Sequence, residues 1–254
     1  MLCSMNNTVL RCFWLAIALT SGAARADEQA LEIHARIMPD KGLDQRVALT
    51  LDACSGRYDE SLIDFLVKNR IPASIFVTKK WLKRNPQGLA TLKANLDLFD
   101  VENHGENHIP AVIGQGREVY GIAGEPDMAH LRREVLEGAR AVEAATGVAP
   151  HWYRGATGVY DLQAADEIRR LGFKIAGFSL NADDGASLSK ASVVKRLRRV
   201  KGGDVIIAHM NKPDSDTAEG LAAALPELLR QGYVFVRLDQ IELVELHGAG
   251  PAKR

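Results

Sequence analysis

The stretch Arg46-Val47-Ala48-Leu49-Thr50-Leu51-Asp52 has the β-branched and apolar composition of a buried strand, and it ends on a carboxylate. Gly56 then marks a turn. Residues 60–70 carry apolar side chains at helical spacing, and Asp59 precedes them as a suitable N-cap. The ordered part of the chain therefore opens with a strand, a turn and a helix, which is the repeating unit of an α/β fold.

The same unit recurs to the end of the chain. Further strands are expected at residues 73–78, 96–102, 153–154, 173–180, 204–208 and 233–238. Further helices are expected at residues 79–94, with an interruption at Pro86, and at residues 127–146, 161–171, 190–200 and 217–231. This alternation predicts parallel strands with crossover helices. The glycine-containing segment 109–126 has no helical stripe, and we expect it to form a lid or wall of the substrate site.

Polar side chains stand at the carboxyl ends of these strands. They are Asp52, His104, His108, Arg154, Asp183, Asp184 and His209. In a parallel barrel, the carboxyl ends of the strands form the active-site face. Taken singly, Asp52 could cap a turn, Arg154 could form a surface ion pair and His209 could be a core histidine. Their joint placement is what favours a functional site.

Two imidazoles stand four positions apart in Asn103-His104-Gly105-Glu106-Asn107-His108. Each could present a neutral ring nitrogen to a divalent metal, and ligands this close in sequence lower the entropy cost of assembling a site. The order differs from the zinc-peptidase motif His-Glu-x-x-His, because Glu106 is third rather than second and Gly105 weakens a helix. Two surface histidines would explain the pair alone equally well.

The composition is that of an ordinary globular chain of 254 residues, with 46% hydrophobic residues, 25% charged residues and a net charge of zero. Nothing in it indicates a nucleic-acid partner. The N-terminus differs, since Arg11 precedes the apolar residues 12–19 and Ala24-Arg25-Ala26 offers small residues for cleavage. We predict a signal peptide over residues 1–26. Because its apolar run is too short to cross a bilayer, we expect an exported protein, periplasmic or secreted, without a stable membrane anchor.

The rest of the chain, after the predicted signal peptide, is expected to have three parts. Residues 27–45 are expected to be a weakly ordered lead, residues 46–240 to form the domain, and residues 241–254 to form a flexible tail. Cys3 and Cys12 lie in the signal peptide, so Cys54 is the single cysteine of the mature chain and an internal disulfide is excluded.

Several motifs between residues 46 and 238 resemble those of the polysaccharide deacetylases, also called the NodB-homology or carbohydrate esterase four family. Residues 47–53 (VALTLDA) are similar to the first motif, centred on Thr-Phe-Asp-Asp, and residues 104–108 (HGENH) are similar to His-Ser/Thr-x-x-His. Residues 154–158 (RGATG) stand where the family has Arg-x-Pro-Tyr-Gly, and residues 207–209 (IAH) stand where it has Leu-x-His. Residues 181–185 (NADDG) keep part of Asp-x-x-Asp-Trp.

The resemblance implies a distorted (β/α)7 barrel and a hydrolase that removes N- or O-acetyl groups from an acetylated glycan. It implies a divalent metal, above all Zn²⁺, that activates the attacking water and is held by His104 and His108. Asp52 would be the general base and Arg154 would orient it. His209 would be the general acid, with Asp184 beside it.

The largest departure from the family is Ala53, which stands where the family has a metal-binding aspartate. Three replacements are open: Asp52 itself, Asp59 or another carboxylate, and the thiolate of Cys54. Residues 52 and 54 share a face if the strand continues, which favours the thiolate. Against it, a lone cysteine is more often a small buried hydrophobic residue.

Three other functions stay open at this point. A catalytically silent glycan-binding protein would explain Ala53, and a hydrolase of a non-sugar C–N bond would use the same constellation. A Cys54 nucleophile paired with a histidine is also conceivable. The presence together of all five polar residues of the matching motifs favours the deacetylase; they are Asp52, His104, His108, Arg154 and His209.

Overall fold

The structure is a computed structural model that describes residues 30–40 and 45–246. The predicted signal peptide, residues 1–26, and the last part of the predicted tail, residues 247–254, lie outside the described residues. Among the helices that are described, none is long and apolar enough to cross a membrane.

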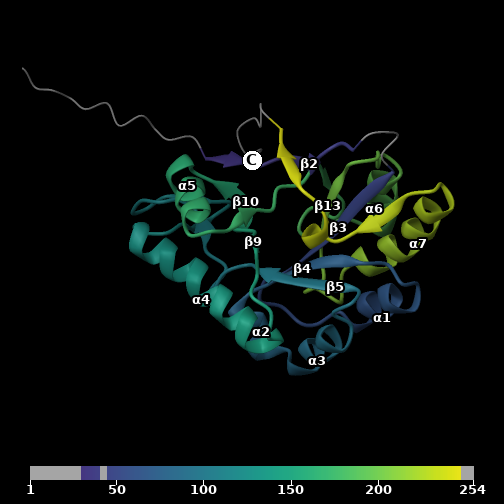
Figure 1. Ribbon diagram of the computed structural model, residues 1–254, viewed down its shortest axis with the longest axis horizontal. Coiled ribbons are helices and arrows are strands. Elements are labelled where there is room, and N and C mark those ends of the chain that lie inside the picture. Colours follow the sequence, from purple (N-terminus) through teal and green to yellow (C-terminus); the bar gives the residue numbers. More distant parts are fainter. Residues whose placement is uncertain (1–29, 41–44, 247–254) are drawn as a thin grey trace, which may run out of the picture.

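A parallel sheet forms the centre of the molecule (Figure 1). Its strands lie in the order β11-β9-β5-β4-β3-β13-β12, and β14 pairs with β3 as well. Their bounds are β3 Arg46–Ala53, β4 Ala73–Val77, β5 Phe99–Asn103, β9 Trp152–Tyr153, β11 Lys174–Ile175, β12 Leu180–Asn181, β13 Val205–His209 and β14 Val234–Val236. The sheet curls on itself as an open half-barrel, which confirms the predicted distorted (β/α)7 fold.

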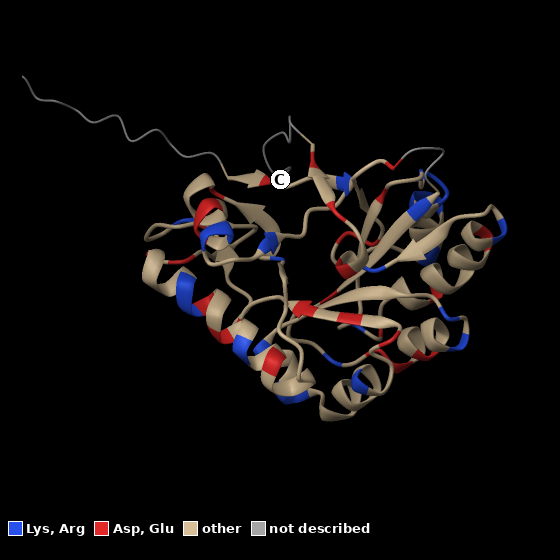
Figure 2. Ribbon diagram, in the orientation of Figure 1, with Lys and Arg blue, Asp and Glu red and all other residues tan. Residues whose placement is uncertain are grey.

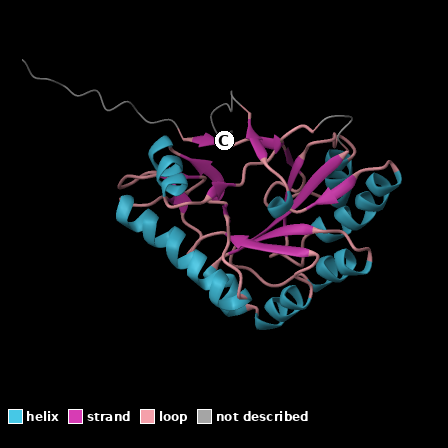
Figure 3. Cartoon of the chain, in the orientation of Figure 1, coloured by secondary structure: helices cyan, strands magenta, loops and turns pink. Residues whose placement is uncertain are grey.

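The helices lie along the outer side of the curled sheet (Figure 3). They are α1 Glu60–Lys68, α2 Lys79–Arg84, α3 Pro86–Ala94, α4 Met128–Thr146, α5 Leu162–Arg170, α6 Lys190–Leu197 and α7 Thr217–Arg230. The predicted helix 79–94 is divided at Pro86, which opens α3, because proline lacks an N–H and its φ suits a first helical turn. Charges of both signs are interspersed along these helices (Figure 2).

Strand β3 is buried on both faces, and its alternation separates two kinds of surroundings. Leu49, Leu51 and Ala53 belong to the large apolar cluster that also takes in α1 and α7. Ala48 belongs to a second cluster with side chains of β4, β9 and β13. Asp52 therefore points away from the helices and toward the inside of the half-barrel.

The predicted lead and tail hold three short strands, which correct the expectation for both segments. β1 (Leu31–Glu32) pairs with β10 (Ala156–Tyr160), and β2 (Ala35–Ile37) pairs with β15 (Leu243–Glu245), both antiparallel. Residues 31–37 were expected to be weakly ordered and residues 243–245 to belong to a flexible tail. Backbone pairing between these two distant segments gives both of them a regular structure, which no local pattern in either segment indicates.

Two predicted strands also differ in extent. The strand expected at residues 96–102 begins at Phe99, and the strand expected at residues 173–180 is divided into β11 and β12. Between them, the Phe178 N–H donates to the Ile33 carbonyl and the Phe178 carbonyl accepts the Ala35 N–H, at 3.4 and 3.1 Å. The segment leaves the sheet because the N-terminal strands take its backbone groups.

The glycine-containing segment 109–126 is not entirely irregular. It holds the short strands β6 (Pro110–Ala111), β7 (Glu118–Val119) and β8 (Ile122–Ala123), and β6 pairs with β10 in parallel. Its expected role as a lid or wall of the substrate site stays a prediction.

Candidate metal centre and acid–base groups

The register of the parallel strands brings their carboxyl ends to one edge of the sheet. His209 at the end of β13 stands opposite Asp52 on β3, and Asp52 stands opposite Phe76 on β4. On the other side of β4, Val77 stands opposite Asn103, the residue before His104. Asp52, His104 and His209, which are far apart in the sequence, are therefore neighbours at this edge.

The loop that carries the histidine pair is held by Glu134 of α4. The buried Glu134 carboxylate accepts the backbone N–H groups of Asn107 and His108, each at 2.8 Å. The Asn103 side chain adds two bonds, since its amide donates to the Val135 carbonyl at 2.8 Å and its oxygen accepts the Gly105 N–H at 2.9 Å. The loop is thus fixed through its backbone, and the imidazoles are left free to bind.

Close approach of α4 explains the two glycines at this contact. A Cβ on Gly105, which has φ +90°, would lie 2.3 Å from Glu134 Oε1. A Cβ on Gly138 would lie 2.3 Å from Asn103 Oδ1 and 2.6 Å from the Gly105 carbonyl carbon. The serine or threonine that stands second in the related motif would not fit at position 105 without displacing Glu134.

The two imidazoles are suited to metal binding. His104 Nδ1 lies 2.7 Å from the Arg154 carbonyl, so that nitrogen carries the proton and donates, and Nε2 keeps a free lone pair. Burial, only partly opposed by Asp52, lowers the pKa of His104. Burial and the neighbouring His104 lower the pKa of His108 to about 3. Both rings are therefore neutral at physiological pH, as a metal ligand must be.

Cys54 joins the two histidines. Its Sγ lies 3.5 Å from His104 Nε2, and one donor atom from each of Cys54, His104 and His108 lies within 4.8 Å of the other two. Neutral imidazole nitrogens and a cysteine sulfur are ligands that zinc accepts. The residues present therefore fit a zinc-type divalent metal.

The family's metal-binding aspartate corresponds to Ala53 in this chain, and the other proposed substitutes for it fit less well. The Asp59 carboxylate caps α1, where it accepts the Leu62 N–H at 3.1 Å and the Ser61 hydroxyl at 2.7 Å. Ala53 itself packs in the large apolar cluster on the helix side of β3. Asp52 faces the site, with Oδ2 3.8 Å from His104 Nε2, but its other oxygen is bonded to Arg154.

Asp52 is held as a carboxylate by Arg154. Arg154 Nη1 donates to Asp52 Oδ1 at 2.8 Å and to the Thr50 hydroxyl at 2.9 Å, and Nε donates to the Ala176 carbonyl at 3.0 Å. The guanidinium also lies 4.3 Å from the centre of the Phe76 ring. Burial opposes ionisation of Asp52, but the opposing effect of the charged neighbours, above all Arg154, outweighs burial and lowers the pKa of the carboxyl.

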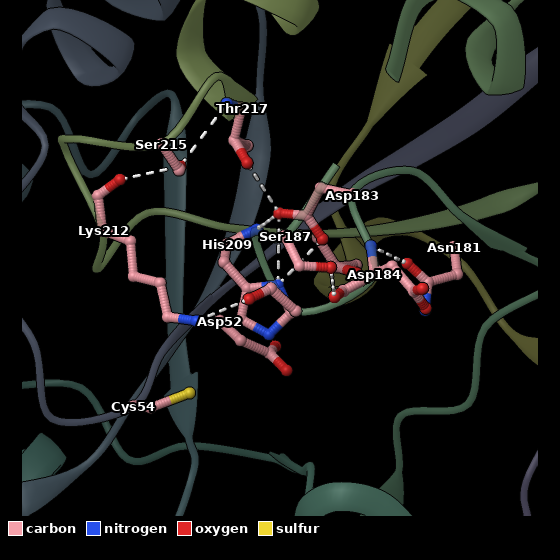
Figure 4. A network of polar contacts seen from close by, with 12 residues as sticks. Asp52, Cys54, Asn181, Asp183, Asp184, Ser187, His209, Lys212, Ser215 and Thr217 are labelled. Carbon is pink, nitrogen blue, oxygen red and sulfur yellow. Dashed lines mark hydrogen bonds and ion pairs between the residues drawn. The ribbon is translucent and has the colours of Figure 1, made fainter. Parts of the chain in front are cut away.

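His209 is held by Asp183, not by Asp184 as the sequence predicted. His209 Nδ1 donates to Asp183 Oδ1 at 2.9 Å, and Asp183 Oδ2 accepts the His209 N–H at 2.8 Å and the Thr217 hydroxyl at 3.0 Å. Asp184 is turned to solvent, 3.8 Å from Arg196. The ring of His209 lies between the carboxylates of Asp183 and Asp52 (Figure 4). Burial would lower the pKa of His209, but Asp183 and Asp52 outweigh it and raise that pKa.

Two residues of this site were not expected from the sequence. Glu134 stands within the apolar stripe of α4, between Leu131 and Val135, and a carboxylate at such a core-facing position was the signal that could have identified it. Thr217 opens α7 and is fully buried against Asp183. Nothing in the sequence around Thr217 points to that contact, since it joins residues far apart in the chain.

A cysteine nucleophile is not favoured by these surroundings. Such a nucleophile needs a thiolate beside a protonated imidazole. Burial and the Asp52 charge raise the pKa of the Cys54 thiol, whereas burial lowers the pKa of His104, the nearest imidazole. Both pKa shifts oppose an ion pair between a Cys54 thiolate and a protonated His104.

Comparison with known proteins agrees with the motifs. The profile of the polysaccharide deacetylase family matches residues 40–176, just over half of the chain. A peptidoglycan-N-acetylglucosamine deacetylase of Listeria monocytogenes is 27% identical over 207 residues, which cover 80% of this chain. The same residues cover 40% of the Listeria protein, so the chain spans less than half the length of that relative.

Solved structures of low sequence identity establish the same fold. PdaA of Bacillus subtilis, a family 4 carbohydrate esterase, superposes with a TM-score of 0.63 at 22% identity, covering 81% of this chain and 83% of that chain. A pseudoenzyme of the same esterase family from Bacillus anthracis superposes with a TM-score of 0.62 at 20% identity, covering 78% of this chain and 65% of that chain. The fold thus accommodates an esterase and a pseudoenzyme alike.

Proposed function

The chain belongs to the polysaccharide deacetylase family, and from this premise we propose that it is an exported, metal-dependent hydrolase that removes acetyl groups from a polysaccharide or cell-wall glycan. One observation carries the proposal. A buried Asp52–Arg154 pair and a His209–Asp183 pair stand at the same sheet edge as two neutral imidazoles. The relative from Listeria monocytogenes, which acts on peptidoglycan, supports a glycan of the cell wall as the substrate.

We assign the metal to His104 and His108, with zinc as the preferred ion. When bound, the ion would act as a Lewis acid that makes water more acidic and polarises the acetyl carbonyl. The protein's own contribution is to hold both imidazoles neutral and to fix the His104 ring through the Arg154 carbonyl.

Asp52 acts as the general base. It must be a carboxylate to take a proton from the attacking water, and Arg154 stabilises that form. The lowered pKa makes Asp52 a weak base in proton-transfer terms but keeps it ionised at all moderately acidic pH values. Arg154 also fixes the orientation of the carboxylate, because three of its bonds are to groups buried in the half-barrel.

His209 acts as the general acid. Asp183 holds Nδ1–H, so Nε2 is the atom that carries the transferable proton toward the leaving amine or hydroxyl. Because its pKa is raised, the His209 ring stays protonated to a higher pH than an isolated imidazole does. The base and the acid therefore have pKa values displaced in opposite directions, as this division of roles requires.

A cavity lined by residues that follow β3 and β13 is a candidate site for neighbouring sugar units. Its volume is about 430 Å³, and its lining includes Gly56, Arg57, Asn211 and Lys212. Asn211 and Lys212 follow β13, the strand that ends at His209, and Gly56 and Arg57 follow β3, the strand that carries Asp52. The side chains of Arg57, Asn211 and Lys212 offer polar atoms that suit the hydroxyl groups of a glycan.

A catalytically silent glycan-binding protein is the second candidate. Ala53 favours it, because a methyl group packed in the core cannot ligate a metal. The retained acid–base groups favour the enzyme instead, since binding alone does not need a buried base and a protonated acid.

The two candidates are separated by metal analysis and acetate release. The protein without residues 1–26 is assayed with acetylated chitooligosaccharide, peptidoglycan and xylan, before and after chelation and with zinc restored. We expect about one metal ion per chain, acetate release from one of these glycans, and loss of activity on chelation that zinc reverses. Absence of both metal and acetate release would leave the binding protein as the function, and release of acetate from small non-sugar amides alone would indicate a different hydrolase.

A further inference from the structure

The direction of the side chains at the end of β3 decides which residue can replace the aspartate missing at position 53. Ala53 faces the helices, where it packs in the large apolar cluster. Asp52 and Cys54 flank it and face the opposite side, as successive side chains along a strand do. Figure 4 shows the Cys54 sulfur on the side of the chain where Asp52 and His209 lie.

The distances around Cys54 agree with shared ligation of one ion. Tetrahedral zinc with one sulfur at about 2.3 Å and one nitrogen at about 2.0 Å places these two donors about 3.5 Å apart. The observed separation of Cys54 Sγ and His104 Nε2 is 3.5 Å. The third donor, from His108, lies within 4.8 Å of both.

The backbone holds the two ligand-bearing segments together. The Thr78 hydroxyl donates to the Cys54 carbonyl, and the Thr78 N–H donates to the Ala53 carbonyl at 3.3 Å. The next residue, Lys79, donates its N–H to the Gly105 carbonyl at 3.0 Å. The start of α2 therefore ties the end of β3 to the histidine loop, so the sulfur and the imidazoles are positioned before any ion binds.

Each of the other donor groups near this point has one atom bonded elsewhere. Asp52 Oδ1 accepts from Arg154, Asp59 caps α1, and His209 Nδ1 donates to Asp183. On this basis, and resting on the proposed function, we propose that Cys54 is the third protein ligand of the metal, in a Cys-His-His set. Ligation forms a metal–sulfur bond, breaks the S–H bond and releases the proton to solvent.

A thiolate changes which ions the site prefers. Sulfur is a soft ligand and favours zinc, cobalt(II) and cadmium over magnesium and manganese, which prefer oxygen ligands. A site with a carboxylate in place of Cys54 would discriminate less strongly between these two groups of ions. A measurement of which ions the protein binds most tightly therefore distinguishes a thiolate ligand from a carboxylate ligand.

Cobalt(II) loading tests the ligand directly. A cobalt–thiolate bond gives a charge-transfer absorption in the near ultraviolet that nitrogen and oxygen ligands do not give. We expect this band in the protein without residues 1–26 and in Ser55→Ala, whose exposed side chain lies next to Cys54. We expect Cys54→Ser to lose the band and to bind zinc more than about 100-fold more weakly, since losing an outer partner of a ligand alone costs roughly 10- to 100-fold.

X-ray absorption of the unaltered zinc-loaded protein provides a second measurement that needs no variant. One sulfur neighbour at about 2.3 Å is the expected result. A bound ion without a sulfur neighbour, or a cobalt band that survives in Cys54→Ser, overturns the proposal, and acetate release by the same preparation would then leave the proposed function standing. A protein that binds no ion at all overturns both.

Discussion

The site has two halves that are held in different ways. The proton-transfer half consists of two side-chain ion pairs, Asp52 with Arg154 and His209 with Asp183. The metal half consists of Cys54, His104 and His108, whose positions are set mainly by backbone hydrogen bonds to Glu134 and Thr78.

This difference bears on which substitutions each half can tolerate. In the proton-transfer half, removing one partner would leave a buried charge unpaired, which typically costs about 3–5 kcal/mol. In the metal half, the loop geometry does not depend on the chemistry of the ligand side chains, so a ligand can be moved by one position. The departures Ala53 and Gly105 fall in the metal half, whereas the departures within residues 154–158 and 181–185 leave the paired side chains of Arg154 and Asp183 in place.

The largest expected effect is on the metal half, in His104→Ala. The variant removes the ligand that lies closest to Cys54, so we expect loss of bound metal and of acetate release to below detection. Metal content by mass spectrometry and acetate release are the measurements, and His151→Ala, an exposed histidine, is the matched control. Full activity in His104→Ala would show that the metal half is not needed for the reaction.

The next effect is on the proton-transfer half, in Asp52→Asn. Asparagine keeps the shape but cannot take a proton, so we expect kcat to fall about 10²- to 10⁴-fold while the metal content stays near that of the unaltered protein. Asp166→Asn, at a side chain that is 79% exposed, serves as control. If Asp52→Asn instead lost its metal, Asp52 would be a ligand and the division into two halves would be wrong.

A smaller effect is expected when the backbone support of the metal half is weakened in Glu134→Gln. The neutral amide is a weaker acceptor for the N–H groups of Asn107 and His108, so the histidine loop is less well ordered. We expect zinc to bind roughly 10- to 100-fold more weakly, with kcat at saturating zinc little changed. Zinc titration measures the difference, with the exposed Glu143→Gln on the same helix as control. Unchanged zinc affinity would contradict the role given to Glu134.

The smallest effect is a displacement of the pH profile in Asp183→Asn. The folded-state pKa of His209 is raised by Asp183, so the acid is present at low pH and is lost as the pH rises through that pKa. Removing the Asp183 charge leaves burial to lower the pKa. The basic limb of kcat/KM should then move to lower pH, while the acidic limb, which Asp52 sets, should stay in place. The matched control is Asp184→Asn. If the basic limb moved in Asp184→Asn and not in Asp183→Asn, Asp184 would be the partner of His209, as the sequence predicted.

Local sequence patterns were sufficient for much of the fold. The apolar run from Val47 to Leu51, the capping residue Asp59 and the break at Pro86 act over a few residues, so the strand and helices near them were predicted closely. The pairing of β2 with β15 was not predictable in this way. It joins segments about two hundred residues apart, and neither has a pattern that specifies the other.

The sequence by itself determined that Asp52, His104, His108, Arg154 and His209 follow strands, and that a parallel sheet would collect them at one edge. Only the tertiary structure decided which neighbour each one contacts. It placed Asp183 rather than Asp184 against His209, buried Glu134 under the histidine loop, and turned Ala53 to the core and Cys54 to the histidines. The reason is physical: adjacent residues at a strand end point to opposite sides, and a difference of one position decides between ligand, core and solvent.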